Sequence, residues 1–185
     1  MLYTKKGDRG TTKTLRQKRG ERISKASCQT EALGALDELN SFLGLVKVKV
    51  KSLKWKVVSK KPTEILEQVQ QNLFIIQAEV AGADKIIKVG KVKELENYIG
   101  VAERMMPPIK PFFISGGTEL GALLDVARTF ARRAEREVIR VVETKEISVG
   151  ENTLAYLNRL SSLCYALARF ANFKAGVKEQ SPKYE

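Results

Sequence analysis

Residues 120–144, LGALLDVARTFARRAEREVIRVVET, constrain the fold of this chain more than any other stretch. Apolar side chains recur in this stretch at steps of three and four. At about 100° per residue, such spacing places them in one stripe along a helix. The members of this apolar stripe are Leu124, Ala127, Ala131, Ala134, Val138 and Val141. We therefore predict a long helix with one buried face.

A row of arginines runs beside this stripe. Arg128, Arg132 and Arg136 follow one another at steps of four residues, a spacing at which like charges repel by a few tenths of a kcal/mol. Guanidinium groups suit bidentate contact with phosphate or carboxylate oxygens. The row indicates an anion supplied by another molecule, and a solvated basic face is the alternative. Glu135 projects between row and stripe, where we expect it to touch Arg132 only.

Four other stretches have the apolar spacing of helices: residues 29–46, 63–83, 91–106 and 152–174. We expect Thr63 and Asn152 to be the N-caps of the second and the last of these. With the long helix they make five, joined by short turns and without a convincing sheet. The chain is therefore predicted to be an all-α bundle of one domain over residues 1–185.

Two segments outside these helices have no clear helical period. Residues 46–61 alternate apolar residues with lysine, which fits either a short hairpin turning near Ser52 or a lysine-rich connection. In this segment Trp55 is expected to be a packing anchor. The end of the chain, residues 177–185, reads as a mobile polar tail.

The residue inventory excludes several kinds of site. The sequence has no histidine and only two cysteines, Cys28 and Cys164, far apart. This removes imidazole bases, Cys-His nucleophiles and histidine-based metal sites, so no metal-ligating residue is predicted. The cysteines are expected to be buried thiols in a reducing cytosol. An N-terminus without an apolar core predicts no secretory signal, and no apolar run is long enough for a membrane span. We therefore expect a cytoplasmic protein.

Basic residues dominate the charge. The net charge is +12, which predicts attraction to nucleic acid, nucleotide phosphates or anionic lipid. Nine of the basic residues lie within residues 1–25, among several glycines and threonines. Backbone N–H groups freed by glycine, hydroxyls and lysines suit a phosphate-cradling loop. A disordered basic tail is the alternative.

The connection before the long helix, IKPFFISGGTEL, contains two adjacent aromatic residues. Phe112 and Phe113 either pack into the core or line an apolar pocket. In the last helix, Asn158 interrupts an apolar neighbourhood, and a half-buried Asn needs hydrogen-bond partners.

Four local patterns occur together along the chain: YTKKGDRGTT, ALDELNSFLG, FFISGGTEL, and ARTFARRAEREV followed by YLNRLSSL. In this order and spacing the chain resembles the PduO-type ATP:corrinoid adenosyltransferases over nearly its whole length. The resemblance implies a five-helix bundle with ferritin-like up-down packing, assembled as a homotrimer with ATP sites between subunits. It implies transfer of the 5′-deoxyadenosyl group of ATP, bound with Mg²⁺, to cob(I)alamin, forming adenosylcobalamin and triphosphate.

The resemblance also implies roles for particular residues. Residues 1–25 would form the nucleotide-binding segment and residues 26–176 the helical bundle. The ATP-binding residues would be Thr4, Lys5, Lys6, Gly7, Thr12, Lys13, Lys25, Arg132, Arg133, Glu135, Arg136 and Asn158. Asp37 would pair with Arg132 across the subunit interface, and Phe112 would lie at the corrinoid pocket and help displace the lower cobalt ligand. Arg132, Arg136, Phe112 and Asp37 are the expected catalytic set.

One position departs from the family pattern, and one alternative function stays open. Ser162 stands where the family's NRLSD block has an aspartate. The alternative is a basic helical protein that binds nucleic acid without catalysis. ATP-independent binding that weakens steeply with salt would distinguish that protein from the enzyme.

Overall fold

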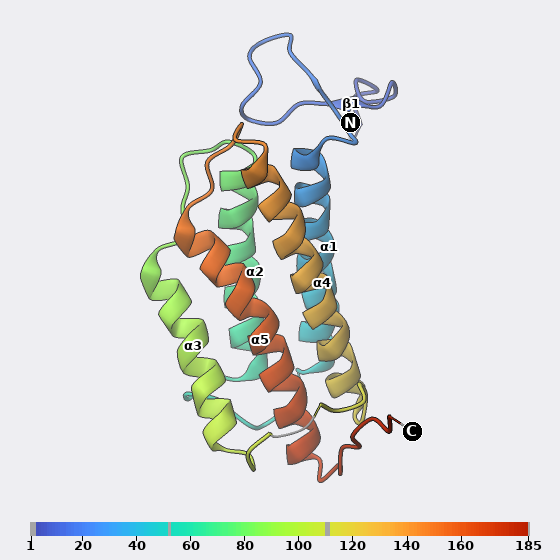
Figure 1. The fold of residues 1–185 in the computed structure, drawn as a ribbon, viewed down its shortest axis with the longest axis vertical. Coiled ribbons are helices and arrows are strands. Elements are labelled where there is room, and N and C mark those ends of the chain that lie inside the picture. Colours follow the sequence, from blue (N-terminus) through green and yellow to red (C-terminus); the bar gives the residue numbers. More distant parts are fainter. Residues whose placement is uncertain (1–2, 52, 110–111, 185) are drawn as a thin grey trace.

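The structure, a computed structural model, describes residues 3–51, 53–109 and 112–184. Five helices lie alongside one another on the long axis of the molecule (Figure 1). They are α1 (Cys28–Lys49), α2 (Pro62–Val80), α3 (Val89–Arg104), α4 (Glu119–Glu143) and α5 (Glu151–Lys174), with a small sheet of β1 (Thr11–Thr12) and β2 (Ile23–Ser24). The predicted all-α, five-helix bundle is confirmed. No described helix has the length and hydropathy needed to cross a membrane.

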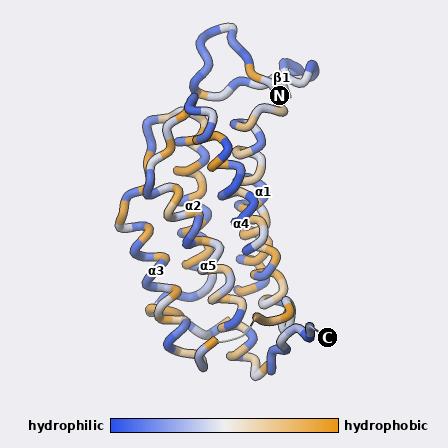
Figure 2. The backbone as a smooth tube through the Cα atoms, viewed as in Figure 1, coloured by the Kyte–Doolittle hydropathy of each residue, from blue (hydrophilic) through white to orange (hydrophobic). Residues whose placement is uncertain are grey.

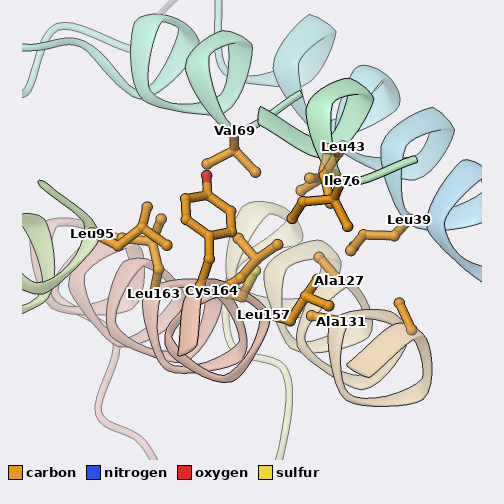
Figure 3. Close-up of a cluster of buried hydrophobic side chains, with 14 of the residues drawn as sticks. Leu39, Leu43, Val69, Ile76, Leu95, Ala127, Ala131, Leu157, Leu163 and Cys164 are labelled. Atoms are coloured by element: carbon orange, nitrogen blue, oxygen red, sulfur yellow. The ribbon is translucent and has the colours of Figure 1, made fainter. Parts of the chain in front are cut away.

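Helix α4 lies at the centre of the packing. It contacts α5 and α1, while α3 packs on α5 and α2 packs on α1. All six residues of its predicted apolar stripe are buried. Figure 2 shows hydrophobic and hydrophilic residues interleaved along each helix, and side chains from all five helices meet in the core (Figure 3). Burial of this stripe leaves the opposite faces of α4 for the charged residues.

Two predicted helix starts were wrong. Pro62, which has no N–H, takes the first position of α2, so the N-cap is Lys61. The backbone N–H of Lys61 donates to Glu64 at 2.6 Å. Helix α5 starts after Gly150 because the buried carboxylate of Glu79 accepts from the Gly150 N–H at 2.7 Å. The starts of α2 and α5 therefore depend on residues other than the capping residue itself, which a rule based on the type of that one residue does not include.

The lysine-rich segment is not a hairpin around residue 52. Helix α1 continues to Lys49, because Val46 and Val50 are buried on the same side of the helix. A single bridge pairs Val57 with Lys60 further on, and Ser52 itself lies outside the described residues. Trp55 packs edge-on against Phe170 of α5 with ring centroids 5.0 Å apart, which confirms it as a packing anchor.

The first part of the predicted mobile tail is docked, contrary to that prediction. The Ile114 N–H donates to the Gln180 carbonyl at 2.9 Å, and Glu179 forms an ion pair with Arg169 at 3.1 Å. Residues 177–180 therefore lie against the connection that precedes α4.

Candidate functional site

A groove of about 600 Å³ runs beside α4. Its walls come from α3, α4, α5 and the connection that leads into α4. The lining side chains used below are Phe112, Phe113, Arg128, Arg132, Ser162 and Tyr165. The structure thus brings Phe112 and Arg132, which the sequence indicated separately, to the same groove.

Phe112 is 79% exposed at the groove. The alternative that it packs into the core was wrong, whereas Phe113 next to it is partly buried. Gly116 and Gly117 both have positive φ, at 125° and 97°, and turn the chain into α4. Helix α4 then begins at Thr118, whose side chain accepts from the Gly121 N–H at 2.9 Å. This turn leaves Phe112 outside both neighbouring helices.

Two members of the arginine row, Arg128 and Arg132, line the groove, and Arg136 follows one turn further along α4. Arg128 is half-buried, with its Nε 4.0 Å from the Asp125 carboxylate and without a hydrogen-bond partner for that Nε. Arg132 and Arg136 are exposed, and neither forms an ion pair with any residue that the structure describes. Two uncompensated guanidinium groups on α4, with that of Arg132 in the groove wall, suit an anionic ligand.

Arg133 and Asp37 lie where α1 meets α4. Arg133 pairs with Glu38 of α1 and stacks 5.3 Å from the ring centre of Phe130. Asp37, which precedes Glu38, is exposed. Within the described chain Asp37 forms no ion pair with Arg132. Its expected contact with Arg132 across a subunit interface stays a prediction.

Glu135 contacts α5. Its Oε1 accepts from the Asn158 amide at 2.9 Å, and Arg159 donates to Asn158 at 2.6 Å. The expectation that Glu135 could touch only Arg132 was wrong, because α5 packs alongside α4 and supplies a second partner. Asn158 is exposed, not half-buried, so its amide can also reach a ligand on this face.

The basic segment at the N-terminus is folded over residues 3–25. Strands β1 and β2 pair Thr12 with Ile23, and the Lys25 N–H donates to the Gly10 carbonyl at 2.9 Å. The Lys25 amine lies so close to Gly7 that a Cβ there would be 3.0 Å from it. The disordered alternative was therefore wrong for the described part of this segment. Glycine and lysine are brought together, as a phosphate-binding loop requires.

The remaining predicted loop residues share this folded segment. Thr4, Lys5, Lys6 and Lys13 are exposed, and Thr12 is partly buried. Figure 1 shows the segment at the opposite end of the bundle from the start of α4, which follows the Phe112 connection. Within one chain, therefore, the N-terminal loop and Phe112 do not share a site.

The two cysteines differ in environment. Cys28, at the start of α1, is exposed and lines a second cavity of about 410 Å³ below the N-terminal segment, so its predicted burial was wrong. Cys164 is buried, as predicted, and burial raises the pKa of its thiol to about 12. Cys164 is therefore not a nucleophile near neutral pH. The described residues hold no cluster of three or more metal-ligating side chains.

Comparisons with known proteins agree with this geometry. Residues 2–171 match the family model described as cobalamin adenosyltransferase. The chain belongs to this family. It is 37% identical over 175 residues to the corrinoid adenosyltransferase PduO of Citrobacter freundii, covering 91% of this chain and 49% of that protein. It is 36% identical over 180 residues to the corrinoid adenosyltransferase of Bacillus subtilis (strain 168), covering 95% and 89%. The chain thus spans about half the length of the first relative.

A solved structure extends the likeness to three dimensions. It is a phenylalanine-to-histidine variant of the PduO-type ATP:corrinoid adenosyltransferase from Lactobacillus reuteri, complexed with cobalamin and ATP. Its TM-score is 0.85 at 30% identity, covering 100% of this chain and 97% of that one. The structural likeness therefore extends over both the N-terminal segment and the helical bundle of this chain.

Sequence reasoning did not single out two charged residues, Asp125 in the groove wall and Arg169 behind it. They form an ion pair at 2.6 Å with both side chains almost fully buried. A signal existed, since Arg169 lies between apolar residues of the stretch 152–174, which has the spacing of a helix with a buried face. Its partner, however, is on another helix and could not be identified from spacing.

Proposed function

We propose that this chain transfers the 5′-deoxyadenosyl group of ATP to the cobalt of cob(I)alamin, releasing triphosphate. The observation that carries the proposal is the groove in which exposed Phe112 faces the same space as the uncompensated Arg132. One substrate would need an apolar wall and the other a cationic one. Relatives named corrinoid adenosyltransferase and a neighbour complexed with cobalamin and ATP support this pairing.

On the ATP side, the chain supplies charge and position. Arg132 and Arg136 neutralise the triphosphate of Mg²⁺-bound ATP, and the Gly7–Lys25 loop binds its phosphates. Arg133, Glu135 and Asn158 border the same part of α4 and orient the nucleotide. Co(I) is a strong nucleophile that attacks C5′, and the C5′–O bond breaks as triphosphate leaves. Neutralising that leaving group requires no general base, which fits a chain without histidine.

On the corrinoid side, Phe112 covers the lower face of the cobalt. An aromatic ring at this place excludes water or the base from the fifth coordination position, which eases reduction to Co(I). Ser162 gives the α5 wall of the groove a hydroxyl in place of the carboxylate usual in the family. The Phe112 ring can take this role because it lies in the connection between α3 and α4, outside both helices, and is exposed to the groove.

We propose further that the protein is a homotrimer with ATP between subunits. In one subunit the N-terminal phosphate loop and the Phe112 connection lie at opposite ends of the bundle. A neighbouring subunit would therefore supply the loop that completes the site at this groove. Asp37 is exposed on α1 and would pair with Arg132 of the neighbour. Apolar side chains exposed on α1 and α4, among them Leu45 at 47%, Val48 at 57% and Val126 at 40%, are suited to such an interface. Two unpaired thiols favour the reducing cytoplasm as its location.

The test is an absorbance assay for the Co–C bond with ATP and chemically reduced cobalamin. We expect Arg132→Ala and Arg136→Ala each to lose at least about tenfold in ATP affinity or turnover, about 1.5–3 kcal/mol per charge-assisted contact. Lysine at either position should not restore activity, since the bidentate fork is lost. Arg140→Ala is the matched control, because Arg140 pairs with Glu137 away from the groove.

Two results would contradict the proposal. Wild-type kinetics in both arginine variants would return the row to a solvated face. Binding to nucleic acid that weakens steeply with salt, without any Co–C bond formation, would favour the alternative function.

A further inference from the structure

Arg169 of α5 carries a charge and is nevertheless only 2% exposed. Its Nη2 lies 2.6 Å from Asp125 Oδ2, and its Nε lies 3.1 Å from Glu179 Oε1. The guanidinium also lies 5.0 Å from the ring centre of Tyr165 and 6.0 Å from that of Phe113. Arg169 thus contacts α4, the tail and the groove aromatics at once.

Both acidic partners of Arg169 connect to the segment that leads into α4: Asp125, which lines the groove, does so directly, and Glu179 does so through Asn172. Asp125 Oδ2 accepts from the backbone N–H of Gly116 at 3.2 Å. Glu179 Oε1 accepts from the Asn172 amide at 2.6 Å. Asn172 in turn accepts from the Thr118 N–H at 2.9 Å and donates to the Gly116 carbonyl at 2.7 Å. The connection and the tail are therefore held to α5 through one charged centre.

The same centre reaches the arginine row. The other carboxylate oxygen of Asp125, Oδ1, lies 4.0 Å from Nε of Arg128. The position of Asp125 is thus shared between the connection and the cationic wall of the groove. A buried ion pair often adds little to the stability of the fold. The contacts of the Arg169–Asp125 pair with the connection and with Arg128 instead indicate a role in positioning these groups.

We propose that Arg169 is a positioning residue that holds residues 177–180 against residues 112–118, the connection that carries the aromatic wall of the groove. This inference rests on the proposed function, because it takes the wall to be the corrinoid side of the site. Without the guanidinium, Asp125 and Glu179 repel each other, the tail separates from the connection, and Phe112 loses its fixed place opposite Arg132. Arg132, Arg136 and the N-terminal loop form none of these contacts, so ATP binding is kept.

The first test measures steady-state kinetics of Arg169→Met. We expect the KM for the corrinoid to rise, or kcat to fall, by at least tenfold, with the ATP dissociation constant within threefold of wild type. The control is Arg140→Met, which removes an arginine of α4 outside the groove. It should leave the corrinoid KM, kcat and the ATP dissociation constant unchanged. A proportional loss of ATP binding and corrinoid activity would overturn the positioning role.

Glu179→Gln keeps the test decisive if Arg169→Met does not fold, because Glu179 lies in the tail beyond the last helix. We expect it to raise the corrinoid KM about threefold or more. If both variants fold, their effects on KM should be less than multiplicative when combined, since each breaks the same contact. An unchanged KM in Glu179→Gln, or strict multiplication in the double variant, would overturn the proposal.

A second measurement does not depend on activity. Amide hydrogen exchange, without substrates, should be at least tenfold faster at Gly116 and Thr118 in Glu179→Gln or Arg169→Met than in wild type. Unchanged exchange would overturn the proposed wall. If wild type forms no Co–C bond, the proposed function fails, and hydrogen exchange still decides whether Arg169 holds the connection and tail together.

Discussion

Truncation of Phe112 separates a groove role from a packing role. Because Phe112 is 79% exposed, only about a fifth of its surface is buried. Full burial of a Phe side chain contributes roughly 1.5–3 kcal/mol, so Phe112→Ala should reduce the free energy of unfolding by about 0.5 kcal/mol. For a chain of this size that lowers Tm by about 1–2 °C. A core phenylalanine would instead cost about 3–5 kcal/mol.

The expected effect on chemistry is much larger. If the ring excludes a lower ligand from the cobalt, its removal lets water or the base return, and reduction to Co(I) becomes harder. We therefore expect kcat to fall about tenfold or more, while the ATP dissociation constant stays within about threefold of wild type. Measuring Tm, ATP affinity and kcat on one preparation compares these effects directly.

Two other phenylalanines provide controls. Phe74 on α2 is 60% exposed and does not line the groove, so Phe74→Ala should leave kcat and ATP affinity unchanged. Phe113 is partly buried and stacks near Arg169, so its truncation should cost more stability than that of Phe112. A large fall in Tm for Phe112→Ala, with a proportional loss of ATP binding, would refute the reasoning.

Three further predictions concern assembly, thiols and pH. Asp37→Asn should lower the trimer fraction in a molar-mass measurement or raise the KM for ATP, with helix content unchanged. A double variant in which the charges of Asp37 and Arg132 are exchanged should recover part of the loss, and strict additivity of the single losses would show that the two residues never meet. An aromatic disulfide reagent should titrate Cys28 in the native protein and Cys164 only after denaturation, since Cys164 is buried; native labelling of both would contradict this. Burial disfavours the Glu94 carboxylate, but hydrogen bonds from a tyrosine and a lysine outweigh it and lower its pKa. Glu94 therefore stabilises the fold above its unfolded pKa and loses this effect as pH falls, so the stability gap between wild type and Glu94→Gln should shrink in acid, and a constant gap would refute it.

Much of the helical architecture follows from spacing along the chain. The apolar stripe of α4 is buried residue by residue as predicted, because helix geometry alone determines which side chains share a face. The same argument applies to α5, in which Leu157, Leu160 and Cys164 are spaced along one face and are all buried. Helix starts were less predictable. The cap of α5 depends on Glu79, which is 71 residues away in the sequence from Gly150.

The groove shows where local information ends. The sequence indicated Arg132 and Phe112 separately, one from charge spacing and the other from a glycine-rich connection and a resemblance. That they face one space depends on how α3, α4 and α5 pack, which no local pattern encodes. Packing also decided that Phe112 is exposed and that Glu135 meets Asn158.

By itself, the sequence determined that this chain is a basic helical bundle with an arginine row on its long helix, because periodicity and composition are properties of the chain alone. Only the tertiary structure decided which charges are compensated. Arg133 and Arg169 find carboxylates on other segments, whereas Arg132 and Arg136 find none among the described residues. Partners are chosen by proximity in space, and proximity across helices follows from packing rather than from spacing in sequence.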